Sequence, residues 1–517
     1  MTRLDDGLAW IMLVPWLLAL DRTSMRGAIV AGMTMAIAFV LAVLGWFATS
    51  IGDYAGVPGW VAFAAVVVLA PFLEPQFVTF AVARRLVRRG GGFWRPALCA
   101  AGVYVGTEWA VPRLFGDTLG FALYPAPWLR QAADIAGPAG LTFLVVIANE
   151  ATADAVERAL GARGLHARLA VALPGAARVA AVVLALAAYG AWREHALAYP
   201  SDAPAIRVGV VQANMSHYDR LAADVGRFEA VRRILDGHFA LSNELLARGD
   251  VDVLVWPETV YPTTFGAPKS EDGAAFDREI SGFAARTGVP LVFGSYAVAG
   301  DDEFNAAIFL EPRDGPPAFA AYRKATLFPL TERVPRWLDS PRVRTWLPWL
   351  GTWKPGSGGD VLPLRLWDGR IVRVAPLICY DDLAPRLARA AVRSGAGVLI
   401  ALSNDSWFGD GPGGLLHLVG AAFRSIETRR PQVRATNTGI SAIISPTGAF
   451  VTTLRSGARG TLAGVVVPES RATTLALAWG DWFGPTALVL GLVLLVPVRR
   501  RPPAVARKTP RHDRRVA

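Results

Sequence analysis

The sequence predicts a multi-span α-helical membrane domain joined to a layered α/β domain outside the cytoplasm. Three observations support this: a mean hydropathy of +0.35 with only 18% charged residues, apolar runs near both ends, and a central segment where short β-branched runs alternate with amphipathic stretches. Such a composition is unusual for a soluble chain of 517 residues. Lipid is therefore the first partner to expect.

The membrane domain is predicted from seven apolar runs, each close to the roughly 20 residues that a helix needs to cross a bilayer. The runs are Leu8 to Leu20, Ala28 to Phe47, Val57 to Val82, Phe93 to Val111, Ile135 to Ala155, Ala176 to Trp192 and Trp482 to Val498. Several contain Pro or Gly, which membrane helices tolerate. We expect about six spans in residues 1–194, a C-terminal span in residues 475–498, and a basic cytoplasmic tail in residues 499–517.

Basic residues predict the orientation of these spans, because cytoplasmic loops carry an excess of Lys and Arg. The segments that fall on one side are Arg22 to Arg26, Arg84 to Arg95, Arg158 to Arg168 and the tail after Val498. Residues 195–474 then fall on the opposite, extracytoplasmic side. A cleaved signal peptide is a poor explanation for the first run, since Asp5 and Asp6 replace the basic leader.

Composition also excludes several classes of function. The net charge of +11 lies largely in short runs beside the apolar segments, and no zinc, helix-turn-helix or aromatic RNA-binding pattern accompanies it, so we expect no nucleic acid partner. With only two cysteines, one of them in the apolar run at Cys99, a disulfide framework is excluded. Cys379 is then alone in its domain.

The central segment reads as an α/β domain in which strands alternate with helices. The predicted strands are Ile206 to Val211, Val251 to Val255, Leu291 to Phe293, Val372 to Ile378 and Gly397 to Leu402. Tyr218 to Arg248 is expected to form one amphipathic helix, and Leu383 to Ser394 another. This alternation predicts a layered sandwich.

Three reactive side chains follow strand-like runs: Glu258, Lys324 and Cys379. The ends of strands are where α/β sheets place their active sites. A buried Glu258 could be a general base for a thiol, and Lys324 could stabilise an oxyanion. A helix just after Cys379 would lower the pKa of its thiol. Each residue also has a plainer explanation: Glu258 could form a salt bridge, Lys324 could be a solvated charge, and Cys379 could be an inert core cysteine.

Together the three residues form a known pattern. Trp256-Pro-Glu258, Tyr322-Arg-Lys324 and Ile378-Cys-Tyr380, in this order, resemble the nitrilase (carbon-nitrogen hydrolase) superfamily. The flanking spans narrow the resemblance to the apolipoprotein N-acyltransferases, bacterial inner-membrane enzymes that add the third acyl chain to lipoproteins. The stretches that support it further are Gln212-Ala-Asn214, Ser403 to Asp410, His417, Arg429 to Pro431, Arg434 to Ile440, Glu108-Trp109 and Gly480-Asp-Trp482.

The resemblance implies an αββα nitrilase-like domain in residues 195–474 and a ping-pong reaction. Cys379 would take an acyl chain from a phospholipid as a thioester, and the α-amine of a diacylglyceryl-cysteine apolipoprotein would then collect it. Glu258 would be the general base and Lys324 the oxyanion stabiliser, with no metal or cofactor and a single chain as the working unit. The supporting residues implied are Glu332, Tyr380, Asp381, Asn404 and Trp407.

Some positions depart from the family pattern. Asp381 stands where the family has Glu, Leu330-Thr331 replaces Phe-Gly, Ala213 replaces Gly, and Leu416 replaces Gln. These changes bear on substrate choice and rate more than on reaction class, because moving a supporting carboxylate by about 1 Å can cost about 100-fold. The family usually has eight spans and this chain begins where the second would, so we expect its N-terminus to face outward.

Other functions remain open at this point. The acceptor could be water, which would make the chain a membrane-tethered amidase, or another lipid-anchored amine. A non-catalytic membrane scaffold is a further class, against which the complete set of three residues argues. A loop containing Trp337, Trp346, Trp349 and Trp353 could dip into the membrane interface or cover an acyl chain, or it could be a packed insertion.

Overall fold

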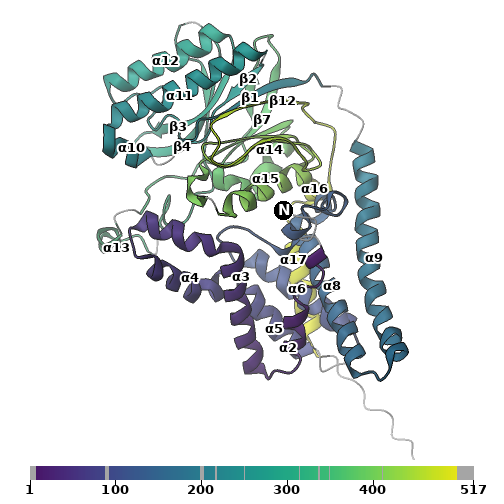
Figure 1. The fold of residues 1–517 in the computed structure, drawn as a ribbon. Helices are drawn as coiled ribbons and strands as arrows, with labels where there is room; N and C mark the ends of the chain where they lie inside the picture. The colour runs from purple at the N-terminus through teal and green to yellow at the C-terminus, as the bar shows by residue number, and fades with distance from the viewer. Residues whose placement is uncertain are drawn as a thin grey trace, which may run out of the picture.

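The computed structural model describes residues 7–87, 92–197, 203–215, 218–249, 251–313, 315–335, 338–347, 350–409 and 411–497. It consists of a helical domain and, stacked on it, an α/β domain (Figure 1). The predicted tail at residues 499–517 and the loop arginines Arg88 and Arg89 lie outside the described residues.

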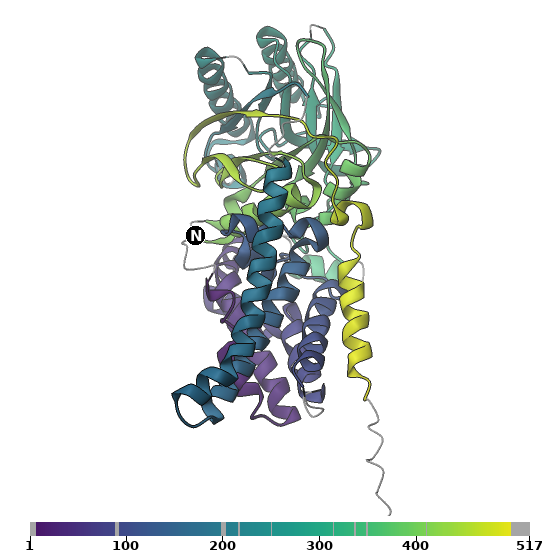
Figure 2. The same cartoon turned by 90° about the vertical axis from the view of Figure 1, so that its right-hand side faces the viewer.

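The helical domain combines the N-terminal helices with one helix from the end of the chain. Its elements are α2 (Val14–Leu20), α3 (Met25–Ala55), α4 (Gly59–Leu73), α5 (Gln76–Val87), α6 (Trp94–Ala110), η2 (Leu119–Leu123), α7 (Pro127–Arg130), α8 (Ala133–Gly161), α9 (Leu165–Leu197) and α17 (Phe483–Leu495). Figure 2 shows α17 descending from the α/β domain along the helical domain. A Cβ added at Gly102 of α6 would lie 2.6 Å from the Ala487 carbonyl oxygen of α17, so small residues let these two helices approach closely.

Only some of the predicted spans are long helices. Within the described residues, α3, α8 and α9 are long and apolar enough to cross a membrane, and α4 with α5, bent by 44°, would form a fourth span. The other predicted runs contain α2, α6 and α17, which have 7, 17 and 13 residues. A total of seven spans therefore stays a prediction.

The α/β domain is built on two six-stranded sheets with strand orders β12-β1-β2-β3-β4-β5 and β11-β10-β9-β8-β7-β6. The strands are β1 (Ile206–Gln212), β2 (Val253–Val255), β3 (Leu291–Ala299), β4 (Asp302–Leu310), β5 (Phe319–Arg323), β6 (Leu362–Arg365), β7 (Ile371–Ile378), β8 (Val398–Ser403), β9 (Gln432–Thr436), β10 (Ser441–Ile444), β11 (Phe450–Leu454) and β12 (Gly460–Val466). In the first sheet β1, β2 and β3 are parallel, and in the second β7, β8 and β9 are parallel. All five predicted strands are present.

Helices α11 (Arg227–Arg248) and α12 (Glu271–Thr287) cover the outer face of the first sheet, and α14 (Pro385–Arg393) and α15 (Gly413–Thr428) cover that of the second (Figure 1). The other helical elements after β1 and before α17 are α10 (Tyr218–Val225), α13 (Pro341–Trp346), η3 (Cys379–Leu383), η4 (Asp405–Phe408) and α16 (Leu475–Trp479). The expected single helix from Tyr218 to Arg248 was wrong: Gly226, at φ 88°, separates α10 from α11. That conformation favours glycine and interrupts a helix.

The tryptophan-rich loop divides between solvent and protein. Trp346, at the end of α13, is 82% exposed, whereas the Trp353 ring packs 4.6 Å from the Tyr296 ring. Trp337 and Trp349 lie outside the described residues. A role for this loop at the membrane interface stays a prediction.

Helix α15 joins the two domains. Its residues Leu418, Phe423 and Ile426 belong to the same buried cluster as apolar residues of the helical domain, and the Phe423 ring stacks on Phe121 of η2 at 5.1 Å. Just after α15, the fully buried Arg429 donates to Asp134 of α8 at 2.7 Å. Apolar packing and a buried ion pair thus fix the α/β domain on the helices.

We expect Arg429→Met to lower the free energy of unfolding by roughly 3 kcal/mol, because it leaves the carboxylate of Asp134 buried with one partner fewer. Thermal unfolding of the full chain in detergent measures this change. The matched control is Arg248→Met, at an exposed position on α11, which should stay within about 0.5 kcal/mol of wild type. Equal effects of the two substitutions would contradict a docking role for Arg429.

Candidate functional site

The site forms where strands of both sheets end. Glu258 follows β2, Cys379 follows β7 and Asn404 follows β8. Lys324 follows β5, which runs in the same direction as β3 because β4 is antiparallel to both. The carboxyl ends of these strands therefore bring the predicted residues together between the two sheets.

Glu258 is held by three donors and is 5% exposed. Its Oε1 accepts from Lys324 Nζ at 3.1 Å and from Asn305 Nδ2 at 2.7 Å, and its Oε2 accepts from the Asn404 amide at 2.7 Å. A Cβ at Gly294 of β3 would lie 2.5 Å from Glu258 Cα. Only glycine there allows the backbone of Glu258 to lie against the sheet.

Lys324 is buried between two carboxylates. Its Nζ donates to Glu332 Oε1 at 2.7 Å as well as to Glu258, and Glu332 Oε2 accepts from the Phe328 amide at 2.7 Å. Burial alone would lower the pKa of Lys324, but the charges of Glu258 and Glu332 outweigh it and raise the pKa well above its ordinary value. Lys324 is thus a fixed ammonium group.

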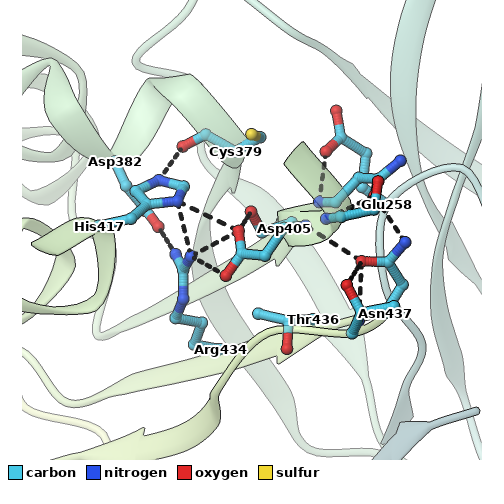
Figure 3. Close-up of polar contacts among 12 residues, drawn as sticks. Glu258, Cys379, Asp382, Asp405, His417, Arg434, Thr436 and Asn437 are labelled. Carbon is cyan, nitrogen blue, oxygen red and sulfur yellow. Dashed lines mark hydrogen bonds and ion pairs between the residues drawn. The ribbon is translucent and has the colours of Figure 1, made fainter. Parts of the chain in front are cut away.

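Cys379 has a strained backbone and a half-buried side chain. Its φ is 48°, the left-handed region that non-glycine residues avoid and that marks strand-to-helix elbows presenting a nucleophile. Figure 3 shows its sulfur on the opposite side of the residue from its carbonyl oxygen, which points to His417. The backbone turn therefore directs the thiol and the carbonyl to different partners.

The surroundings of Cys379 favour the protonated thiol, in contrast to the expected lowering of its pKa. The helix predicted from Leu383 to Ser394 is present as α14, but it begins only at Pro385, and a 3-10 turn, η3, separates its N-terminus from Cys379. Burial first, and the charge of Glu258 second, raise the pKa of the thiol above its ordinary value, while Lys324 lowers it. Attack on a carbonyl would then require transfer of the proton to a base as the bond forms.

Asp381 supports the backbone on both sides of this cluster. Its Oδ2 accepts from the Ile378 amide at 3.1 Å and the Tyr322 hydroxyl at 2.9 Å, and its Oδ1 accepts from the Thr326 amide at 2.7 Å. These contacts tie the strand end before Cys379 to the loop after Lys324. Asp in place of Glu still reaches both segments in this chain.

A second polar network lies behind the cysteine (Figure 3). Its members are His417, Asp405, Arg434 and Asp382, all buried. His417 Nε2 lies 3.1 Å from the Cys379 carbonyl oxygen, which can only accept, so this nitrogen carries the proton. Arg434 bonds to Asp405 at 3.1 Å and to Asp382. The network fixes the position of the Cys379 carbonyl and so stabilises the strained backbone conformation of that residue.

Of the remaining predicted residues, Tyr380 and Trp407 contact the helical domain. The Tyr380 hydroxyl donates to the Leu114 carbonyl, and the Trp407 ring packs 4.5 Å from Tyr54 of α3. Asn404 contributes its backbone amide to Glu258 and its side-chain oxygen to Asn437 at 2.6 Å. Trp407 is therefore apart from the Glu258–Lys324–Cys379 cluster, while Asn404 belongs to it.

Sequence reasoning gave no role to Asn305, although it bonds directly to Glu258. The signal available was a single amide inside the otherwise apolar run from Phe304 to Leu310. His417 and Arg434 lie in the stretches that carry the resemblance, but only the fold shows that His417 contacts the backbone of Cys379 and that Arg434 contacts His417. Among the described residues, no group of three or more His, Cys, Asp or Glu could hold a metal ion.

Comparisons with known proteins match both domains. Residues 207–474 match the family model described as carbon-nitrogen hydrolase, and residues 6–151 match that of the apolipoprotein N-acyltransferase N-terminal domain. A curated protein named apolipoprotein N-acyltransferase from Geobacter metallireducens is 30% identical over 449 residues, which are 85% of this chain and 81% of the relative. One of the same name from Gloeobacter violaceus is 28% identical over 512 residues, 95% and 90% of the two chains.

Among solved structures, Nit3 of Saccharomyces cerevisiae, described as a member of branch 10 of the nitrilase superfamily, is similar with a TM-score of 0.36 and 18% identity. The match covers 52% of this chain and 91% of that one. Nothing about function is carried over at this level of similarity.

Asp381 gives the site a pH dependence. Burial raises its pKa from 3.8 to about 6. Between these two pH values the carboxyl group is therefore protonated in the native state and ionised in the unfolded chain. Asp381 therefore contributes roughly 3 kcal/mol to the free energy of unfolding below about pH 4, and this contribution is lost as the pH rises through 6. We expect Asp381→Asn to flatten the unfolding free energy between pH 4 and 6, measured by denaturant titration, whereas Asp272→Asn on exposed α12 should not. Parallel curves for wild type and Asp381→Asn would exclude this titration.

Proposed function

The chain belongs to the apolipoprotein N-acyltransferase family of the carbon-nitrogen hydrolase superfamily, and on this premise we propose that Cys379 carries the transferred acyl chain as a thioester. The family assignment confirms the function and fold class predicted from the sequence: an acyltransferase with a membrane domain and a nitrilase-like domain. The observation that carries the mechanism is the buried cluster in which Glu258 and Lys324 share a hydrogen bond and both act electrostatically on the Cys379 thiol.

In the first half-reaction, Glu258 takes the thiol proton as the sulfur of Cys379 attacks the ester carbonyl of a phospholipid. Lys324 remains cationic and stabilises the oxyanion of the tetrahedral intermediate. The ester C–O bond then breaks, and Glu258 returns the proton to the leaving glycerol oxygen. The products are a Cys379 thioester and a lysophospholipid.

In the second half-reaction, the α-amine of a diacylglyceryl-cysteine apolipoprotein attacks the thioester. Glu258 takes a proton from the amine, Lys324 again stabilises the oxyanion, and the C–S bond breaks as the thiol is re-formed. Lys324 is suited to this role because Glu332 remains its partner while Glu258 holds the transferred proton.

The position of the cluster supports lipid substrates. Tyr380, next to the nucleophile, bonds to the helical domain through the Leu114 carbonyl, and its ring packs 5.1 Å from Phe328, which itself packs on Phe47 and Phe115. This aromatic layer lies between the cluster and the membrane helices. An acyl chain in the bilayer would reach the thiol along it.

We expect phospholipid alone to leave an acyl mass on the wild-type chain that hydroxylamine removes, and no such mass on Cys379→Ala. Intact-mass spectrometry of the purified protein measures it. Glu258→Gln, which keeps an oxygen to accept from Lys324, should slow formation of the adduct by about 10²–10⁴-fold. Acylation of Cys379→Ala would rule out the thioester, and release of free acid with no transfer to an amine would favour the hydrolase alternative.

We further propose that the enzyme lies in the bacterial inner membrane with its α/β domain on the periplasmic side, as the arginine-bearing loops indicate. In a chain with both native cysteines replaced by alanine, Arg248→Cys on exposed α11 should react with a membrane-impermeant maleimide in intact spheroplasts. Arg26→Cys, in a predicted cytoplasmic loop, should react only after lysis. Labelling of Arg26→Cys in intact spheroplasts, with labelling of Arg248→Cys only after lysis, would contradict this orientation.

A further inference from the structure

A cavity of about 270 Å³ lies where the helical domain meets the α/β domain. We call it the junction cavity. Its walls come from α6 and the loop after it, η2, the start of α8, η3, α14, α15 and the start of α17 with the turn before it. Glu258, Lys324 and Cys379 do not line it, so it is separate from the proposed catalytic cluster.

The interior of the junction cavity carries one unsatisfied group of each charge. Arg424 and Glu427 of α15 pair at 3.0 Å with side chains only 3% and 1% exposed. Within the described residues, Arg424 Nε and Glu427 Oε2 have no hydrogen-bond partner. Buried polar groups are nearly always paired, because leaving one unpaired is costly. The pair therefore offers one donor and one acceptor to a polar ligand.

Arginines of α14 add positive charge to the cavity wall. Arg386 is exposed, and Arg389 lies one turn further along the helix. Arg389 donates to the Gly480 carbonyl at 3.3 Å, and among the described residues neither arginine forms an ion pair with a carboxylate. Guanidinium groups bind phosphate with two parallel hydrogen bonds. This wall fits a phosphodiester.

Tryptophans place the cavity at the surface of a bilayer. Trp109, at the end of α6, lines the cavity and donates to Asp481 at 2.9 Å, and it is 45% exposed. Trp479, just before α17, is 62% exposed. Tryptophan is enriched at the level of lipid headgroups, and α17 descends from this point (Figure 2). The adjoining ligand is then a lipid.

We propose that the junction cavity binds the headgroup of a zwitterionic aminophospholipid. The phosphate lies against Arg386 and Arg389, and the primary amine donates to Glu427 Oε2. Val105 and Phe121, which also line the cavity, face the glycerol end. This lipid keeps its acyl chains and holds the two domains together, so its binding does not depend on the chemistry of Cys379.

The test uses the full chain in the Cys379→Ala background, which prevents consumption of the lipid. Native mass spectrometry counts phosphatidylethanolamine molecules retained from detergent. In the double variant Arg386→Gln/Glu427→Gln, the first substitution is at an exposed position and the second keeps the size of the buried side chain. The glutamine at 427 can still accept a hydrogen bond from Arg424. We expect the double variant to lose one retained lipid, with its affinity weakened at least about tenfold.

Further controls accompany this measurement. Arg248→Gln, on exposed α11, should retain lipid like the parent, and thermal unfolding shows whether each variant is folded. Phosphatidylcholine, which lacks a primary amine, and phosphatidylglycerol should bind the parent more weakly. Soluble glycerophosphoethanolamine should not compete, since it has no acyl chains. Unchanged lipid retention by the folded double variant, or equal retention of all three lipids, would overturn the proposal.

Discussion

The ion pairing of Lys324 between Glu258 and Glu332 is the interaction on which the site depends. Lys324 and Glu258 are buried and Glu332 is 17% exposed, and the two buried charges are tolerable because opposite charges compensate them. The arrangement also sets the chemistry. The carboxylates keep the lysine charged, the charge of Glu258 helps to keep the thiol protonated, and a protonated thiol beside a carboxylate is a nucleophile that acts only when a substrate is in place.

The sequence predicted much of this because the relevant information is local. Strand-like runs ending in Glu258, Lys324 and Cys379 indicated one edge of a sheet, and the two-sheet fold brings these ends together. The role of Asn305 was missed, because a single amide within an apolar strand does not reveal that its side chain reaches Glu258 on another segment. The pKa of Cys379 was also misjudged. A helix was expected after the cysteine, but Pro385 delays α14 and a 3-10 turn intervenes.

The two domains share structural elements, which couples the site to the membrane. Helix α15 covers one sheet and supplies Phe423 and Ile426 to the core of the helical domain, and it also carries His417, which bonds to the backbone of the nucleophile. Tyr380 extends from the nucleophile to the helices. How many helices cross the bilayer could not be fixed from hydropathy alone, since α2, α6 and α17 are apolar but short.

The raised pKa of Cys379 has a second consequence in the periplasm, where we propose that the α/β domain lies. Oxidants and disulfides attack thiolates and not neutral thiols, and the compartment outside the bacterial cytoplasm is oxidising. A cysteine that ionises only during substrate attack resists sulfenylation and mixed-disulfide formation while idle. The other cysteine, Cys99, is buried in α6 of the helical domain. The electrostatics that keep the thiol protonated until substrate is bound thus also protect it from oxidation.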